Sequence, residues 1–325
     1  MISRLALIAA VVAITVLYSL PAFAPDPYVL HVLVLACLYV IPAVGLNLML
    51  GYTGLVSLGH MGFAGVGAYV GAILLVDVKH GFWVTLLLAT LSAGFAGALV
   101  GAICLRFRTH FFMIVTLAFG LLAFSVFNNW DEVTRGAVGF PGIPRPRPIE
   151  LGGVRYTFGP LPHFYYFVLT AAMLVFALQW LVVRSDFGCT LMAIRQDEKL
   201  AQAKGVDVMR YKIAVFALGA ALAGLGGLLH VSFLRVAAPA SFNLAESINA
   251  VLIVVLGGAG SLVGPALGAL VFVALPEYLR MTAEWRLVIF GALLVVVTLF
   301  APRGLAGLFH SRNIGVRPGS DTNVK

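Results

Sequence analysis

Apolar runs of roughly 17 to 25 residues, separated by short polar segments, dominate this sequence and restrict it to one class of structure. Phe82 to Cys104 and Ile213 to Phe233 are representative runs. Such lengths suit helices that cross a bilayer and are too long for the strands of a membrane barrel. Backbone groups inside a bilayer must find their hydrogen bonds within the protein. The pattern therefore predicts an all-α, polytopic transmembrane helical bundle.

The composition supports this class and argues against others. Hydrophobic residues make up 61% of the 325 positions, charged residues only 10%, and the mean hydropathy is +1.03. A soluble domain carries about 25% charged residues. The net charge of +8 is spread over the polar segments rather than gathered on one face, so nucleic-acid binding is not indicated. Cys37, Cys104 and Cys189 lie in or beside apolar runs, without metal-ligand spacing or a disulfide framework.

The number of spans stays open between eight and ten. Residues 5–20 are apolar and end in a sequence that resembles a signal-peptide cleavage site, but Pro25 would directly follow the cut, which favours an uncleaved first helix. We expect a single transmembrane domain over residues 1–305 and a disordered cytoplasmic tail over 306–325. With both termini inside, 13 of the 21 Lys and Arg residues lie on the cytoplasmic side, as the positive-inside rule favours. Residues 128–163 then form an extracytoplasmic loop.

Glycines are concentrated in two stretches. Seven lie between Gly51 and Gly71, and Gly51, Gly54 and Gly59 are placed to break a helix. Such a break is tolerated at membrane depth only where it is buried in protein or lines a cavity. Glycines four residues apart let helices approach closely. The glycines assigned to helix packing are Gly67, Gly71, Gly97, Gly101, Gly260, Gly264 and Gly268.

Few groups in the spans can carry chemistry. The chain has no Gly-Lys pair, so it has no Walker A nucleotide site, and no metal-ligand cluster or nucleophile elbow is present. An enzyme is therefore disfavoured. Carriers coupled to protons or sodium usually need buried carboxylates, and at most one is present here, which favours a pore driven from elsewhere. The residues assigned to a translocation path are Asn47, Ser57, His60, Glu246 and Asn249.

The longest charged run, Arg184 to Lys212, lies between two apolar segments. Its middle is predicted to form a short helix with Leu191, Ile194, Leu200 and Ala201 on one face. This helix is too short and too charged to span a membrane. It lies at the membrane surface, docks on a partner, or only joins two spans as a solvated loop.

Three blocks resemble one family: Gly45 to Tyr69, Gly188 to Phe216, and Ile248 to Phe272. In this order they are similar to the permeases of ABC importers for hydrophobic amino acids, in particular the LivM type for branched-chain amino acids. The likeness runs from about residue 30 to 305.

The resemblance implies a transport subunit without its own ATPase site or bound cofactor, because ATP is used by partner subunits. Those partners would be a second permease of the LivH type, two cytoplasmic ATPases, and a periplasmic or lipid-anchored binding protein. The location would be the bacterial inner membrane. Residues 184–212 would be the coupling loop, with Arg195, Glu198, Ala201 and Gly205 at its motif positions. Lys199 and Leu200 separate Glu198 from Ala201, which departs from the strict Glu-Ala-Ala pattern.

The resemblance also implies alternating access, with the two glycine-rich stretches near the path. The substrate stays open. Relatives of this kind move branched-chain or other amino acids, urea or amides, or aromatic acids, and a binding protein sets most of the selectivity. A secondary carrier or channel that ignores ATP is the remaining alternative.

Overall fold

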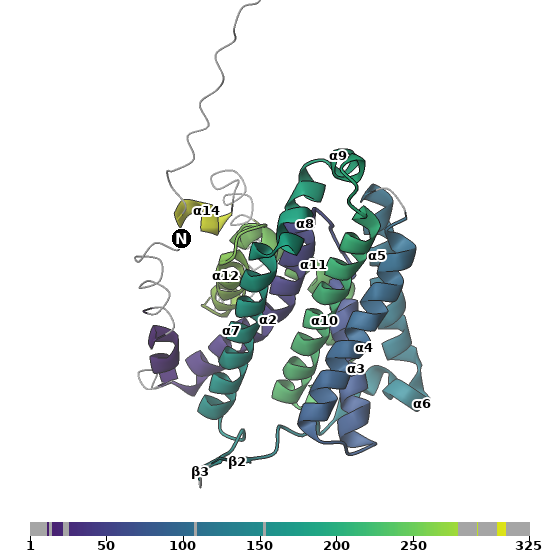
Figure 1. Cartoon of the computed structure of the whole chain (residues 1–325). Helices are drawn as coiled ribbons and strands as arrows, with labels where there is room; N and C mark the ends of the chain where they lie inside the picture. The colour runs from purple at the N-terminus through teal and green to yellow at the C-terminus, as the bar shows by residue number, and fades with distance from the viewer. Residues whose placement is uncertain are drawn as a thin grey trace, which may run out of the picture.

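The computed structural model describes residues 12, 15–21, 26–106, 109–151, 154–278, 291 and 304–309. The predicted all-α, polytopic helical bundle is confirmed (Figure 1). Within the described part, five helices are long and apolar enough to cross a membrane. They are α2 (Pro27–Thr53), α4 (Phe82–Cys104), α5 (Thr109–Asn129), α7 (Leu161–Arg184) and α10 (Val208–Leu234). The predicted spans at residues 5–20 and 287–301 and the tail fall largely or wholly outside the described residues.

Shorter elements connect and complete the long helices. The shorter apolar helices are α3 (His60–Val76), α11 (Leu244–Gly257) and α12 (Gly264–Tyr278). The remaining helices are α6 (Asp131–Thr134), η1 (Gly136–Val138), α8 (Asp186–Gln196), α9 (Glu198–Ala203), η2 (Pro239–Phe242) and α14 (Leu305–Phe309). Two small antiparallel pairs join β1 (Phe140–Pro141) to β4 (Val236–Ala237) and β2 (Ile149–Leu151) to β3 (Val154–Tyr156).

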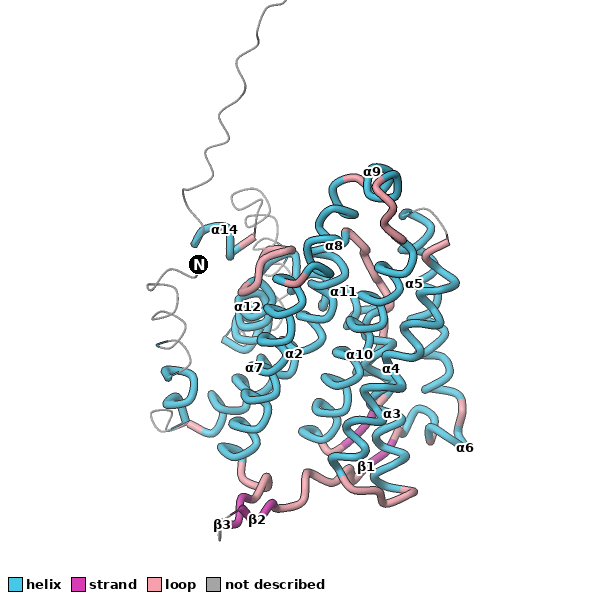
Figure 2. Tube along the Cα trace, viewed as in Figure 1, coloured by secondary structure: helices cyan, strands magenta, loops and turns pink. Residues whose placement is uncertain are grey.

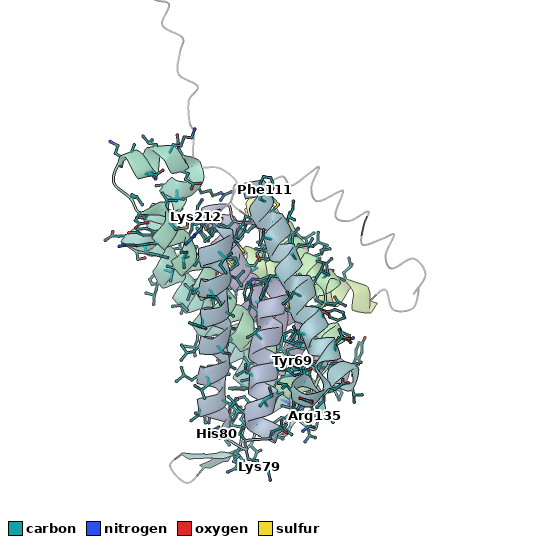
Figure 3. All side chains as sticks on the ribbon, turned by 90° about the vertical axis from the view of Figure 1, so that its right-hand side faces the viewer. Tyr69, Lys79, His80, Phe111, Arg135 and Lys212 are labelled. Atoms are coloured by element: carbon teal, nitrogen blue, oxygen red, sulfur yellow. The ribbon has the colours of Figure 1, made fainter. Side chains whose placement is uncertain are left out.

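The bundle has two distinct ends. Figure 2 shows α8 and α9 at one end and the strand pairs at the other. In Figure 3, Lys212 and Phe111 lie at the α8–α9 end, while Lys79, His80 and Arg135 lie at the opposite end. The sequence assigns the α8–α9 end to the cytoplasm, and that orientation stays a prediction.

The strand end is built by the predicted extracytoplasmic loop, residues 128–163. Arg135 forms a salt bridge of 2.7 Å with Asp77 at the end of α3. The Arg145 guanidinium lies 4.9 Å from the centre of the Phe164 ring. Burial and the nearby Arg235 both lower the pKa of Arg145 from its ordinary value. The loop is thus tied to the bundle rather than free of it.

Helix α10 lies at the centre and packs against α2, α3 and α4 (Figure 1). Its glycines allow this close approach. A Cβ added to Gly226 would lie 2.7 Å from Pro42 Cδ of α2, and one added to Gly227 would lie 2.7 Å from the Ala64 carbonyl carbon of α3. Both distances are shorter than ordinary contacts, so side chains at these positions would push the helices apart.

The predicted helix break lies between α2 and α3. Helix α2 ends at Gly54, which adopts a left-handed conformation with φ +76°. Residues 54–59 are not helical, and Gly59 packs on the backbone of Thr116 in α5. The Leu58 N–H donates to the Thr116 hydroxyl at 3.2 Å. The break is therefore buried within the protein and partly hydrogen-bonded, as a bilayer requires.

Candidate functional site

The loop between α7 and α10 folds into two helices, α8 and α9, rather than the one helix that its sequence predicts. Side chains cap each helix start, because the first backbone N–H groups of a helix lack partners. Ser185 accepts from the Gly188 N–H at 3.4 Å, Asp197 from Leu200 at 3.0 Å, and Asp207 from Arg210 at 3.2 Å at the start of α10. The Asp197 cap ends α8 and starts α9, which changes the phase of the helix.

Because of this change of phase, the prediction that Leu200 shares one face with Leu191, Ile194 and Ala201 is wrong. Ile194, Ala201 and Val208 form a small buried cluster, and Leu191 is fully buried. Leu200 is instead 56% exposed and faces away from them. Leu200 also borders a surface groove of about 430 Å³ between α8 and α9. Other residues that line this groove are Cys189, Ala193, Gln196, Lys204 and Val206.

Three predicted coupling residues shape the loop. Glu198 pairs with Lys212 at 2.7 Å and so attaches α9 to the start of α10. The Glu198 side chain is 53% exposed, whereas that of Lys212 is 12% exposed. Ala201 is buried, and Gly205 turns the chain after α9 with φ +87°. A docking role for these residues stays a prediction.

The fourth predicted coupling residue, Arg195, is directed toward the bundle. It lies in the last turn of α8, and its Nη1 donates to the carbonyl oxygen of Gly51 at the end of α2. Arg195 as a whole residue is exposed. Arg195 therefore connects the loop to the membrane helices, whatever its exposed atoms contact.

Of the residues predicted for a translocation path, Asn47, Ser57 and His60 are fully buried. Asn47 donates to the Ser261 carbonyl oxygen at 2.9 Å, and His60 Nε2 lies 2.9 Å from the Pro42 carbonyl oxygen. Among the described residues, other parts of the chain cover these three side chains completely in this conformation.

Glu246 and Asn249 are half-buried and lie on α11. The Tyr39 hydroxyl donates to Glu246 Oε2 at 3.1 Å. A partly exposed carboxylate on a half-length apolar helix is costly against lipid. This edge of α11 is thus the part of the predicted path best placed to face water or another protein chain.

Tyr39 and Ser247 also belong to this polar network, although neither is among the site residues predicted from the sequence. The Met61 N–H of α3 donates to the Ser247 hydroxyl at 3.1 Å, so the starts of α3 and α11 meet inside the bundle. Ser247 lies in the polar start of an apolar run, and this position could have indicated a site residue. Tyr39 lies within a continuous apolar run, so the sequence around it does not indicate a site residue.

Four of the predicted packing glycines contact α10: Gly67, Gly71, Gly97 and Gly101. Gly264 and Gly268 lie in α12 close to the backbone of α11. Gly260 lies in the turn between α11 and α12 with φ +84°, rather than within a helix. No group of metal-ligating side chains occurs among the described residues.

The chain is similar to known transport proteins. A family model described as "Branched-chain amino acid transport system / permease component" matches residues 28–298. The high-affinity branched-chain amino acid permease protein LivM of Escherichia coli is 33% identical over 289 residues, which cover 83% of this chain and 68% of LivM. LivH of the same organism is 26% identical over 291 residues, covering 83% and 91% of the two chains.

A shorter likeness reaches a sugar permease. The xylose transport system permease XylH of Escherichia coli is 29% identical over 138 residues, or 40% of this chain and 35% of XylH. No solved structure is a significant match. Both the family match and the likeness to LivM extend over most of the chain. They include the α8–α9 loop, the break between α2 and α3, and the turn between α11 and α12. The chain therefore belongs to the family of permease components of branched-chain amino acid transport systems, and is a multi-pass membrane protein.

Proposed function

We propose that this chain is one of two membrane permeases of an ABC importer in the bacterial inner membrane. With a permease of the LivH type, it forms the path for branched-chain, hydrophobic amino acids. Two ATPase subunits on the cytoplasmic side drive the transport, and a binding protein delivers the substrate. The chain itself binds no ATP or other cofactor.

The observation that carries this proposal is the form of the α8–α9 loop. Capped helix starts and the Glu198–Lys212 pair hold the loop on the bundle end. Its outer side presents Leu200 beside a groove with an apolar lining. An exposed apolar side chain on a short, fixed helix is suited to insertion into a groove of a partner.

The substrate class follows from the relatives and from the scarcity of charge. LivM and LivH are named for branched-chain amino acids. Among the five long apolar helices, charged side chains lie only near the ends. An apolar path favours leucine, isoleucine or valine over strongly polar substrates. The partial likeness to XylH shows that related permeases serve other substrates, so the substrate needs a direct test.

The test has two steps. The tagged chain is first purified from its native membrane in mild detergent, and its partners are identified by mass spectrometry. The complex is then placed in liposomes with its binding protein, and uptake of labelled leucine, urea and an aromatic acid is measured with and without internal ATP. We expect two ATPase subunits, a second permease, and ATP-dependent leucine uptake that ignores the proton gradient.

A matched pair of variants tests the docking surface. Leu200→Asp should remove the ATPase subunits from the purified complex, because it charges the exposed apolar side chain at the groove. Gln202→Asp lies on the same helix but does not border the groove, and should retain them. A chain that transports without ATP or purifies without an ATPase would instead be a secondary carrier or channel. ATP-driven uptake of urea or an aromatic acid alone would change the substrate only.

A further inference from the structure

A cluster of polar contacts joins three elements at the α8–α9 end of the bundle. We call it the polar clasp and define it as Asn47, Gly51, Arg195, Gly260 and Ser261. These residues come from α2, from α8, and from the turn between α11 and α12. Two of them, Asn47 and Gly51, are buried parts of α2. The clasp therefore connects segments that lie far apart in the sequence.

The first half of the clasp is a two-way hydrogen bond. The Gly260 N–H donates to Asn47 Oδ1 at 2.9 Å, and Asn47 Nδ2 donates to the Ser261 carbonyl oxygen at 2.9 Å. Asn47 is fully buried, and the amide satisfies one donor and one acceptor of the turn. The amide thus holds the turn to α2 in one orientation.

The second half of the clasp is the Arg195 guanidinium. It donates to the Gly51 carbonyl oxygen in the last turn of α2, where the helix dipole favours a positive charge. Arg195 Nη1 also lies within 3.0 Å of the position that a Cβ on Gly260 would take. The guanidinium therefore hydrogen-bonds to α2 and lies close to the turn.

Two glycines make this arrangement possible. Gly51 and Asn47 are one helical turn apart, and a Cβ on Gly51 would lie 2.8 Å from the Gly260 Cα. Gly260 has φ +84°, which side chains rarely adopt. Only backbone without side chains allows α2 and the turn to approach this closely.

The turn leads directly to the interior of the bundle. Helix α11 runs from this turn back to Ser247, whose hydroxyl accepts from the Met61 N–H at the start of α3. A shift of the turn, carried along α11, would therefore reach the contact between the starts of α3 and α11. Helix α8 is the only part of the clasp that belongs to the exposed loop.

We propose that the polar clasp is the joint through which movement of α8 reaches the membrane bundle. Arg195 and Asn47 act as positioning residues: Arg195 links α8 to α2 and the turn, and Asn47 holds the turn to α2. Arg195 thus transmits the movement of α8 to the membrane helices and does not itself bind the ATPase. This inference rests on the proposed ATP-driven importer.

The test uses the complete importer in liposomes, with its binding protein and internal ATP. The variants are Arg195→Ala, Asn47→Leu, the double variant, and Arg195→Lys, which keeps a charged donor. Arg210→Ala is the matched control, because its side chain is 87% exposed and pairs with Asp207 outside the clasp. Three quantities are measured: the ATPase subunits retained on purification, the rate of ATP hydrolysis, and the leucine taken up per ATP hydrolysed.

We expect Arg195→Ala to retain both ATPase subunits and to hydrolyse ATP at a nearly unchanged rate. Uptake per ATP should fall about tenfold, within the usual range of coupling between distant sites. Because the two residues act in one joint, the double variant should lose no more than the worse single variant. Arg195→Lys and Arg210→Ala should keep most of the coupling.

Unchanged uptake per ATP in Arg195→Ala would overturn the inference. Loss of the ATPase subunits from that variant would also overturn it, because Arg195 would then serve docking. If Asn47→Leu does not fold, Arg195→Ala and Arg195→Lys decide the question. An unmodified importer whose uptake ignores ATP would refute the proposed function before any variant is compared.

Discussion

The close packing of α10 makes a definite prediction for Gly227→Ala. In an isolated helix this change would stabilise the protein by about 1 kcal/mol, because glycine is a poor helix former. In this structure the new methyl group would lie 2.7 Å from the carbonyl carbon and 3.0 Å from the Cα of Ala64. Both are backbone atoms of α3, which cannot move aside as a side chain can. The packing therefore predicts that Gly227→Ala destabilises the protein, whereas the helix propensity predicts that it stabilises it.

The magnitude follows from the balance of the two effects. Overpacking in a closely packed interior costs about 1–3 kcal/mol. We take about 3 kcal/mol from this range, because the new methyl group meets backbone atoms of Ala64. Subtracting the gain of about 1 kcal/mol in helix propensity leaves a net destabilisation of about 2 kcal/mol. Gly159→Ala is the matched control, because a Cβ there meets nothing within 4 Å. It should change the stability by less than about 0.5 kcal/mol.

The assay is thermal unfolding of the purified protein in detergent, followed by the fraction that stays monodisperse after heating. Gly227→Ala should lower the midpoint temperature by roughly 4 °C or more. An unchanged or higher midpoint for Gly227→Ala would refute the close contact between α10 and α3. A comparable loss in Gly159→Ala would show that the assay responds to the substitution type rather than to packing.

Two further predictions concern the loop and the meeting of α3 and α11. Glu198→Ala removes the pair with Lys212, and Gly205→Asp places a side chain at φ +87°, at a cost of about 1–2 kcal/mol. Both proteins should insert but lose ATP-driven uptake, and unchanged uptake in both would contradict a coupling role. Ser247→Ala leaves the Met61 N–H without its partner and should destabilise the protein by about 1–2 kcal/mol in the same thermal assay. A midpoint equal to that of the unmodified protein would count against this hydrogen bond.

The sequence predicts the long helices well, because their length and hydropathy are local properties. The run Phe82 to Cys104 coincides with α4. The glycines after residue 50 also indicate the break before α3, since φ +76° at Gly54 is a conformation that glycine adopts readily. These features depend on a few neighbouring residues and need no knowledge of the partners in space.

Contacts between distant segments are harder to predict. The predicted packing glycines include those of α3 and α4 but not Gly224 and Gly227 of α10, which pack against these two helices. A glycine-rich pattern shows that a close approach is possible without showing the partner. The direction of Arg195 has the same limit, since helical periodicity tells which residues share a face and not what that face meets. Leu200 was misplaced because Asp197 starts a new helix.

The central position of α10 also bears on how the chain assembles during synthesis. Helices α2, α3 and α4 are made first, yet their small-residue faces are covered by a helix that begins about 100 residues after α4 ends. At about 5–20 residues per second, those faces remain in lipid or against insertion factors for roughly 5–20 s. The early helices therefore wait in a loosely associated state, and α10 closes the core. A chain cut short before residue 208 would lack α10, and the small-residue faces of α2, α3 and α4 would stay uncovered.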